Sequence, residues 1–249
     1  MPRFSVLVTC YNASEFIAEC VESLKGQVFE DWECLIGNDA STDDTAAVAE
    51  AAIGGDTRFR LINRETNMGG GENLRDLMMQ AAGDISVELG GDDFLADGEA
   101  LMRINAEYRE FPDCEVTSGS FVIVPRGGVV AHKPDKFWWK RWCFAKTLTW
   151  KTALGRRIFE ELGEVVFEPD TGKVPRYGWD VSIFLPIMYL ARKYRTIHDI
   201  TYAYREHEAN DAKSHRADQE ATEHRVCEWL DARLMPHWNM PWLVKEASP

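Results

Sequence analysis

Apolar residues follow two kinds of spacing in the first part of the chain. Short apolar segments rich in β-formers alternate with segments whose apolar residues recur every three or four positions. The first kind predicts strands at 4–10, 32–37, 58–63 and 85–89. The second predicts helices from about 16 to 25, at 46–53 and at 72–82. This alternation of strand and helix predicts a parallel sheet with right-handed crossovers.

The second half of the chain is less regular. We expect a helix at 97–111, a strand at 115–124, a strand-like run at 148–154 and a helix at 156–162. A strongly apolar helix at 179–192 contains Pro186, which predicts a kink. A strand at 196–204 and a charged helix within 211–231 follow. Neither a repeat nor a linker divides the chain into separate domains.

Three polar clusters come directly after predicted strands, at 9–12, 38–44 and 90–93. In parallel sheets, ligands bind beyond the carboxyl ends of the strands. We therefore expect these clusters to meet in one crevice.

Several residues in or near these clusters are open to a functional and a structural interpretation. Asp92 and Asp93 are adjacent carboxylates, which repel each other unless a cation such as Mg²⁺ or Mn²⁺ is present. Alternatively, they are N-caps of a helix that follows. Asp39 either binds a ligand or caps a helix at Thr42, and Asp180 either acts chemically or caps the apolar helix. Gly69, Gly70 and Gly71 form either an anion-binding loop or a flexible turn. His215 and His224 are expected to be solvated or hydrogen-bonded.

Charge and cysteine usage exclude several classes of protein. The 249 residues include 41 acidic and 28 basic side chains, a net charge of −13, which disfavours nucleic acid as a partner and broad adsorption to an anionic membrane. No two of the 6 cysteines are spaced as a CxxC pair, which disfavours a cysteine zinc site. We see neither a signal peptide nor a transmembrane segment, and expect a cytoplasmic protein with reduced, buried thiols.

Six sequence segments occur in an order that is typical of one protein family. SVLVTCYNASEFIAECVESLKGQ, WECLIGNDASTDDT and NMGGGENLRDLMMQAAGDISVELGGDDFL are followed by WKTALGRRIFEELG, RYGWDVSIF and YREHEAN. From Ser5 to Asn210 the chain resembles family 2 glycosyltransferases. The resemblance implies an α/β fold of the GT-A (Rossmann-like) type: a central, mostly parallel sheet flanked by helices, with a smaller acceptor-side region and C-terminal helices. It suggests a nucleotide-sugar half at 1–95, an acceptor and catalytic half at 96–210, and a helical extension at 211–249.

The resemblance also implies roles for individual residues. The residues implied to bind the nucleotide are Thr9, Tyr11, Asn12, Asp39, Arg75 and Asp92. Of these, Asp39 would hydrogen-bond the nucleotide base and Arg75 would lie near the diphosphate. The metal ligands implied are Asp92, Asp93 and His207. Asp180 matches the general base, and WKTALGRRIFEELG matches an acceptor-side segment.

The chain departs from the family pattern at three positions. Gly90 replaces the first acid of the Asp motif, Trp179 replaces the Glu before the base, and Asn38 replaces an Asp. Glu88 is another acid near Gly90, although we expect strand alternation to aim it differently. A catalytically silent nucleotide- or sugar-binding partner protein therefore stays the alternative function. A nucleotidyltransferase or a dehydrogenase is disfavoured because their glycine-rich loops are absent.

The sequence thus predicts an inverting glycosyltransferase that uses Mn²⁺ or Mg²⁺ and a nucleotide sugar, with UDP favoured, in the synthesis of a polysaccharide or glycoconjugate. The acceptor is a glycan, a lipid-linked sugar or a small molecule. Trp138, Trp139 and Trp179 are candidates for acceptor binding, and the first two lie in an aromatic-basic stretch that could instead pack on the sheet or touch a membrane. The C-terminal aromatic series from Trp229 packs on the domain or forms a homodimer. Peripheral contact with the inner membrane face is the remaining possibility.

Overall fold

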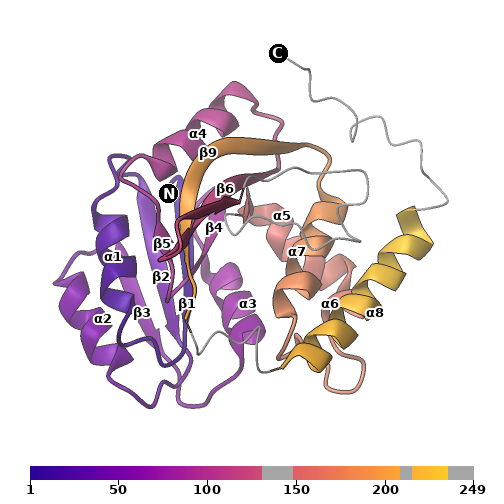
Figure 1. The fold of residues 1–249 in the computed structure, drawn as a ribbon. Helices are drawn as coiled ribbons and strands as arrows, with labels where there is room; N and C mark the ends of the chain where they lie inside the picture. The colour runs from indigo at the N-terminus through magenta and orange to yellow at the C-terminus, as the bar shows by residue number, and fades with distance from the viewer. Residues whose placement is uncertain (131–147, 208–214, 235–249) are drawn as a thin grey trace.

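The computed structural model describes residues 1–130, 148–207 and 215–234 (Figure 1). The strands are β1 (Phe4–Cys10), β2 (Trp32–Asn38), β3 (Phe59–Asn63), β4 (Ile85–Gly90), β5 (Phe94–Leu95), β6 (Val116–Val124), β7 (Gly128–Val130), β8 (Leu148–Lys151) and β9 (Tyr194–Arg205). The helices are α1 (Ile17–Lys25), α2 (Thr45–Ile53), α3 (Gly70–Gln80), α4 (Ala100–Glu110), α5 (Thr152–Glu161), α6 (Gly163–Val166), α7 (Trp179–Leu190) and α8 (Arg216–Leu234). The mixed α/β fold expected from the sequence is confirmed.

One sheet runs through the described part of the molecule in the order β3-β2-β1-β4-β8-β6-β9-β5, with β7 paired to β6. The pairs β3–β2, β2–β1 and β1–β4 are parallel. β8 is antiparallel to both β4 and β6, whereas β6 and β9 pair in parallel. The carboxyl ends of β1, β2 and β4 therefore lie side by side at one edge, as the sequence predicts.

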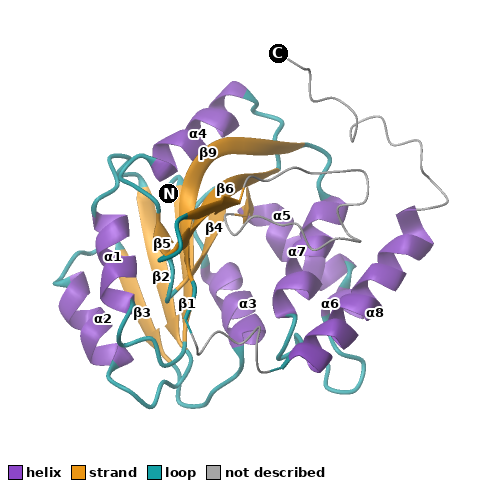
Figure 2. Ribbon diagram, in the orientation of Figure 1, coloured by secondary structure: helices purple, strands orange, loops and turns teal. Residues whose placement is uncertain are grey.

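Helices cover both faces of the sheet, as Figure 2 shows. Val6, Val8 and Leu89 point to the face covered by α1 and α4, where they join one buried cluster. Leu7 and Leu35 point to the opposite face and join the cluster built with α3, α5 and α7. Strand alternation thus divides the apolar residues between two cores, in the three-layer arrangement typical of α/β folds.

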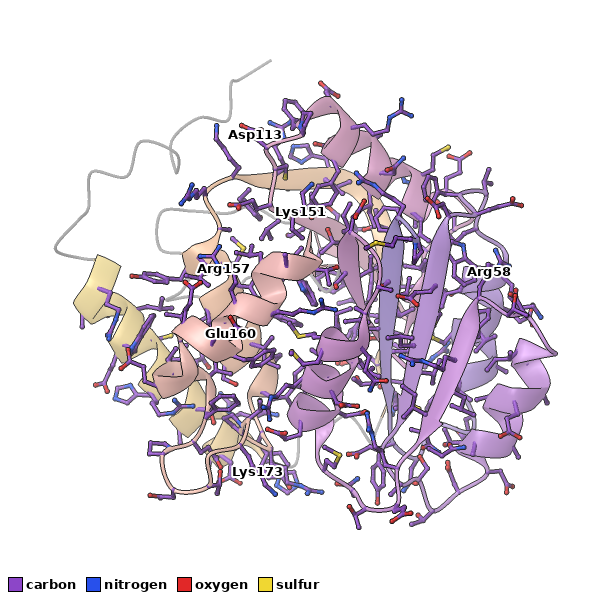
Figure 3. All side chains as sticks on the ribbon, turned by 180° about the vertical axis from the view of Figure 1, so that it is seen from behind. Arg58, Asp113, Lys151, Arg157, Glu160 and Lys173 are labelled. Atoms are coloured by element: carbon purple, nitrogen blue, oxygen red, sulfur yellow. The ribbon has the colours of Figure 1, made fainter. Side chains whose placement is uncertain are left out.

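α5 illustrates how the outer helices are amphipathic. Leu154 and Ile158 are buried in the core, whereas Arg157 and Glu160 are exposed. Figure 3, a view from behind, shows these two charged side chains on the outer helix surface.

The boundary between β8 and α5 differs from the prediction. The strand-like run was expected to reach residue 154, but β8 ends at Lys151 and α5 begins at Thr152. The amide of Thr152 donates to the carbonyl of Asp84 and its hydroxyl lies 2.9 Å from that of Ser86. These tertiary contacts override the β-propensity of the segment. Its Trp150 is fully buried, so this part of the expected acceptor-side segment packs in the core.

The cysteines behave as small buried residues. Cys10, Cys20, Cys34 and Cys114 are buried and Cys227 is half-buried, whereas Cys143 lies outside the described residues. Burial, reinforced by nearby Asp39, raises the pKa of Cys10 to about 12, so its thiol stays protonated at neutral pH.

The C-terminal helix packs on the rest of the molecule. The indole Nε1 of Trp229 donates to Glu164 at 2.9 Å, and its ring meets the edge of Tyr189 at 5.1 Å. Leu230 is fully buried. Packing on the domain, one of the two expectations for the aromatic series, therefore holds at Trp229. The rest of the series beyond 234, and Trp138 and Trp139, lie outside the described residues.

Among the helices in the described ranges, none is both long enough and apolar enough to cross a bilayer.

Candidate active site

The three polar clusters line one cavity of about 600 Å³ at the carboxyl edge of the sheet. The beginnings of α7 and α8 form its other wall. The strand ends contribute Thr9, Tyr11, Asn12, Asp39, Glu88, Gly90, Asp92 and Asp93, and the segment after β9 adds His207 beside Asp92. The opposite wall contributes Arg176, Tyr177, Trp179, Asp180, Phe184, His215 and Gln219. Most residues selected from the sequence therefore meet here.

The first two clusters are tied together through Asn12. Its backbone has φ = 50°, a left-handed conformation that is uncommon for residues other than glycine. Its amide donates to the hydroxyl of Ser41 at 2.9 Å, and its side-chain Oδ1 accepts the amide of Thr42 at 2.8 Å. These contacts hold the loop after β1 rigid at the cavity edge, a place where backbone strain is commonly found.

Asp43 fastens the same loop from the other side. Its carboxylate accepts the amides of Ser14 and Thr45 at 3.1 and 3.0 Å. Burial would raise the pKa of Asp43, but the hydrogen bonds from Thr45 and Ser14 outweigh it and lower the pKa to about 2. Asp43 is therefore ionised whenever the protein is folded near neutral pH.

Asp39 caps a helix other than the one expected. It is 2 % exposed, and its two oxygens accept the amides of Met68 and Gly69, each at 2.8 Å. Gly69 is the N-cap of α3, so the carboxylate anchors the start of α3 rather than a helix at Thr42. Asp39 also lines the cavity.

The three glycines allow close packing between helices. Gly69 has φ = 89°, and Gly70 and Gly71 form the first turn of α3. A Cβ added at Gly70 would lie 2.8 Å from the indole Nε1 of Trp179, and one at Gly71 would lie 2.7 Å from its Cβ. The glycines thus bring the start of α7 against α3, a packing role that is neither of the two roles, anion-binding loop or flexible turn, expected from the sequence.

Asp93 is a buried carboxylate held in place by two donors. It is 3 % exposed, and it accepts the phenol of Tyr202 at 2.6 Å and the amide of Arg205 at 2.7 Å. Burial, together with the charge of Asp93, raises the pKa of Tyr202 well above its ordinary value. Tyr202 therefore remains a hydrogen-bond donor to Asp93.

Asp92 faces the cavity beside His207. Its Oδ2 lies 3.0 Å from the Nε2 of His207, and the ring of His207 packs against Phe16 with centroids 4.8 Å apart. The Nε of Arg205 donates to the backbone carbonyl of Asp92 at 2.9 Å. The carboxylate oxygen of Asp92 and the imidazole nitrogen of His207 are both groups that can ligate a divalent metal ion, and carboxylate oxygens are the ligands that Mn²⁺ and Mg²⁺ prefer. Within the described residues no group of three or more His, Cys, Asp or Glu gathers as a metal site.

Glu88 lines the cavity floor, contrary to the expectation from strand alternation. It is 7 % exposed, and residues 88 and 90 share one face of β4 because side chains alternate with a period of two. Gly90 leaves this face open: a Cβ there would lie 2.7 Å from Oδ1 of Asp92 and 3.0 Å from Oδ2 of Asp93. Position 90 thus carries a glycine in place of the motif's first acid, and a buried acid, Glu88, stands two residues before it on the same face of β4.

Asp180 lies in the first turn of α7, in the opposite wall. Its Oδ1 accepts the amide of Val181 at 3.0 Å. Gly178, with φ = 67°, directs the chain into the helix, and the hydroxyl of Thr222 on α8 donates to the carbonyl of Tyr177 at 3.0 Å. α8 thus supports the turn that carries Asp180.

The side chain of His215 is 39 % exposed, in keeping with the expected solvated histidine, but it also takes part in the cavity wall. It lines the cavity and stacks on Tyr177 with ring centroids 3.9 Å apart. His224, by contrast, is exposed and pairs with Glu228 at 3.0 Å, as expected of a solvated histidine. No signal in the sequence separates the two, because the difference arises from tertiary packing: His215 directly precedes α8 and stacks on Tyr177.

Arg75 lies away from the cavity. Its guanidinium pairs with Glu72 at 3.1 Å and lies 5.0 Å from the centroid of the Phe167 ring. The cationic side chain that does line the wall near Asp39 is Arg176, which donates to Asn67 at 2.8 Å. Sequence reasoning missed Arg176, although it stands four residues before Asp180 in the quoted RYGWD segment.

Comparison with known proteins finds relatives among enzymes that transfer or polymerise sugars. Two curated relatives are a GalNAc(5)-diNAcBac-PP-undecaprenol beta-1,3-glucosyltransferase of Campylobacter jejuni, 30% identical over 119 residues (46% of this chain, 38% of the relative), and a chondroitin synthase of Escherichia coli, 34% identical over 110 residues (44% and 16%). The matched segment thus spans well under half of either relative.

Two solved structures share the fold. TarS of S. aureus, in complex with UDP-GlcNAc, has a TM-score of 0.69 at 19% identity, covering 94% of this chain and 73% of that one. The mannosyltransferase PcManGT of Pyrobaculum calidifontis, in complex with GDP-Man and Mn²⁺, has a TM-score of 0.60 at 19% identity, covering 98% and 72%. The family model "Glycosyl transferase family 2" matches residues 5–161, and the chain belongs to this family.

Proposed function

We propose that this chain transfers a sugar from a nucleotide diphosphate sugar to a hydroxyl acceptor, with inversion at the anomeric carbon. The observation that carries the proposal is the cavity itself. The three strand-end clusters form one wall, and the carboxylate of Asp180 lies in the wall opposite. Such an arrangement can place a base across from a leaving group, as inverting sugar chemistry requires.

The nucleotide is assigned to the end of the cavity formed by Thr9, Tyr11, Asn12 and Asp39. Asp39 retains lone pairs for a base N–H beyond the two amides that it accepts. UDP is the favoured nucleotide, in keeping with the UDP-GlcNAc bound by TarS, although PcManGT binds GDP-Man.

The diphosphate is assigned to the end near Asp92 and His207. These two residues would hold a Mn²⁺ or Mg²⁺ ion, and such an ion, when bound, neutralises charge on the leaving diphosphate. Asp93 is assigned a positioning role because its oxygens accept hydrogen bonds from Tyr202 and Arg205.

Asp180 is proposed as the general base. Its carboxylate takes the proton of the acceptor hydroxyl while that oxygen bonds to the anomeric carbon and the bond from this carbon to the diphosphate oxygen breaks. The nucleoside diphosphate leaves. Trp179 is proposed to line the acceptor approach, and the acceptor is a glycan, a lipid-linked sugar or a small molecule.

The test is a calorimetric titration with UDP and with GDP, each with and without Mn²⁺, on the wild type and on His207→Ala. We expect one nucleotide to bind in a metal-dependent manner and the metal dependence to be lost in His207→Ala. His224→Ala, on the exposed face of α8, is the matched control. If neither nucleotide binds under any condition, the proposed function is wrong.

A further inference from the structure

Glu88 has chemistry that the proposed mechanism does not use. Its carboxylate is on the cavity floor, 7 % exposed. Glu88 has interactions of its own within the protein, and a carboxylate has lone pairs for further hydrogen bonds. A buried acid that opens onto a ligand cavity is a candidate for ligand recognition.

The position of Glu88 places it away from the carboxyl end of β4. Strands rise about 3.3 Å per residue, so the backbone of Glu88 lies about 7 Å further into the sheet than that of Gly90. Asp92 and His207 stand beyond the strand end, where the diphosphate is assigned. Glu88 is therefore beside the deeper part of the cavity. Its charge contributes to the raised pKa of Tyr202, after burial and Asp93, so Glu88 and Asp93 both act on the phenol of Tyr202.

Gly90 keeps Glu88 accessible from the cavity. Positions 88 and 90 share a face of the strand, so a side chain at 90 would stand between Glu88 and the strand end. It would also collide with the present places of Asp92 and Asp93, 2.7 and 3.0 Å from the new Cβ. With glycine at position 90, this face of the strand carries no side chain between Glu88 and the strand end.

Two aromatic side chains of α7 line the same cavity. Trp179 and Phe184 meet edge to face, with centroids 6.1 Å apart. Aromatic surface together with a few fixed polar groups is the composition of a pocket that orients a small polar ligand. A carboxylate accepts strong hydrogen bonds from hydroxyl groups and offers about four lone-pair sites for them.

We infer that Glu88 is a specificity residue for the donor: its carboxylate accepts hydrogen bonds from hydroxyl groups of the donor sugar, so that the donor is a neutral sugar rather than a uronic acid. The inference rests on the proposed function, because it assigns the sugar of the proposed donor to this floor. A uronate would bring a carboxylate next to Glu88, and like charges at short distance repel.

The experiment compares nucleotides with and without their sugar. The affinities of UDP, UDP-glucose, UDP-glucuronate, GDP and GDP-mannose are measured with Mn²⁺ for the wild type, Glu88→Gln and Glu88→Asp. The measured quantity is the ratio of the Kd of the nucleotide sugar to the Kd of its nucleotide. Glu72→Gln is the matched control, since Glu72 is 9 % exposed and its oxygens bind Val174 and Arg75.

For the nucleotide that binds, the ratio for its neutral sugar is expected to rise about ten- to a hundredfold in Glu88→Gln, the size expected for hydrogen bonds to a charged group. The affinity for the nucleotide alone stays unchanged, which also shows that the variant is folded. The wild type is expected to bind UDP-glucuronate more weakly than UDP-glucose, with a smaller difference in Glu88→Gln. Ratios that are the same in the wild type and both Glu88 variants overturn the inference while leaving the proposed function standing. Failure of every nucleotide to bind the wild type overturns both.

Discussion

The hydroxyl of Tyr202 is the contact on which the arrangement of the two motif acids depends most directly. It donates to Oδ2 of Asp93 at 2.6 Å and accepts the amide of Gly90 at 3.2 Å. Tyr202→Phe removes this one oxygen and keeps the ring. Asp93 then stays buried with one donor fewer, and the amide of Gly90 loses its acceptor.

The expected loss of stability follows from these two contacts. A hydrogen bond to a charged group contributes about 1.5–3 kcal/mol and a neutral one about 1 kcal/mol, so Tyr202→Phe should lower the free energy of unfolding by about 2–4 kcal/mol. Tyr108→Phe is the control, because Tyr108 is equally buried but its hydroxyl meets the neutral Oγ1 of Thr149 at 3.0 Å. It should cost about 1 kcal/mol.

The assay is urea unfolding of both variants, followed by a titration with the nucleotide in the presence of Mn²⁺. Tyr202→Phe is expected to weaken metal-dependent nucleotide binding, because Asp93 adjoins Asp92, whereas Tyr108→Phe leaves it unchanged. The reasoning is refuted if the two variants lose equal stability and bind the nucleotide alike.

Three further predictions concern other parts of the cavity and its surroundings. Against the effect of burial, hydrogen bonds lower the pKa of Asp43 from 3.8 to about 2, so its contribution to stability is complete above pH 4 and is lost as the pH falls towards 2. In urea unfolding, the stability difference between Asp43→Asn and the wild type should therefore shrink over this interval, while Asp44→Asn, whose side chain makes no cap hydrogen bond, shows no such trend. Arg75→Ala should leave the nucleotide affinity within about twofold and lower the free energy of unfolding by about 1 kcal/mol, because cation–π and ion-pair contacts are lost. A tenfold loss of nucleotide affinity in calorimetry would show instead that Arg75 contributes to the site. Gly90→Asp, which restores the family residue, should weaken nucleotide binding by displacing Asp92, and tighter binding would contradict this account.

Much of the fold follows from local patterns. The strand at 4–10 was predicted with the bounds that β1 has, because a short apolar run between polar turns leaves little choice. The elements that were missed, β5 (Phe94–Leu95), β7 (Gly128–Val130) and α6 (Gly163–Val166), are too short to show a periodicity. The early start of α5 at Thr152 depends on contacts with Asp84 and Ser86 that lie far away in the sequence.

The candidate site shows the same division between local and distant information. Thr9, Asn12 and Asp92 could be placed from the sequence because each stands at a strand end, and parallel strands end at one edge. Arg75 and His215 could not, because a residue on a helix, or directly before one, reaches the site only if that helix packs in the right orientation. That orientation is set by tertiary packing, here by the ring of Phe167 for Arg75 and that of Tyr177 for His215.

The measurement that tests the central claim most directly is the turnover of a bound donor by Asp180→Asn. Hydrolysis of the nucleotide sugar that the wild type binds is followed together with its Kd, with Asp170→Asn on the exposed loop as control. If Asp180 is the base facing the donor, hydrolysis falls by about 10²–10⁴-fold, the usual contribution of a general base, while the Kd stays within a few-fold of the wild type. Hydrolysis at the wild-type rate in Asp180→Asn would contradict the account.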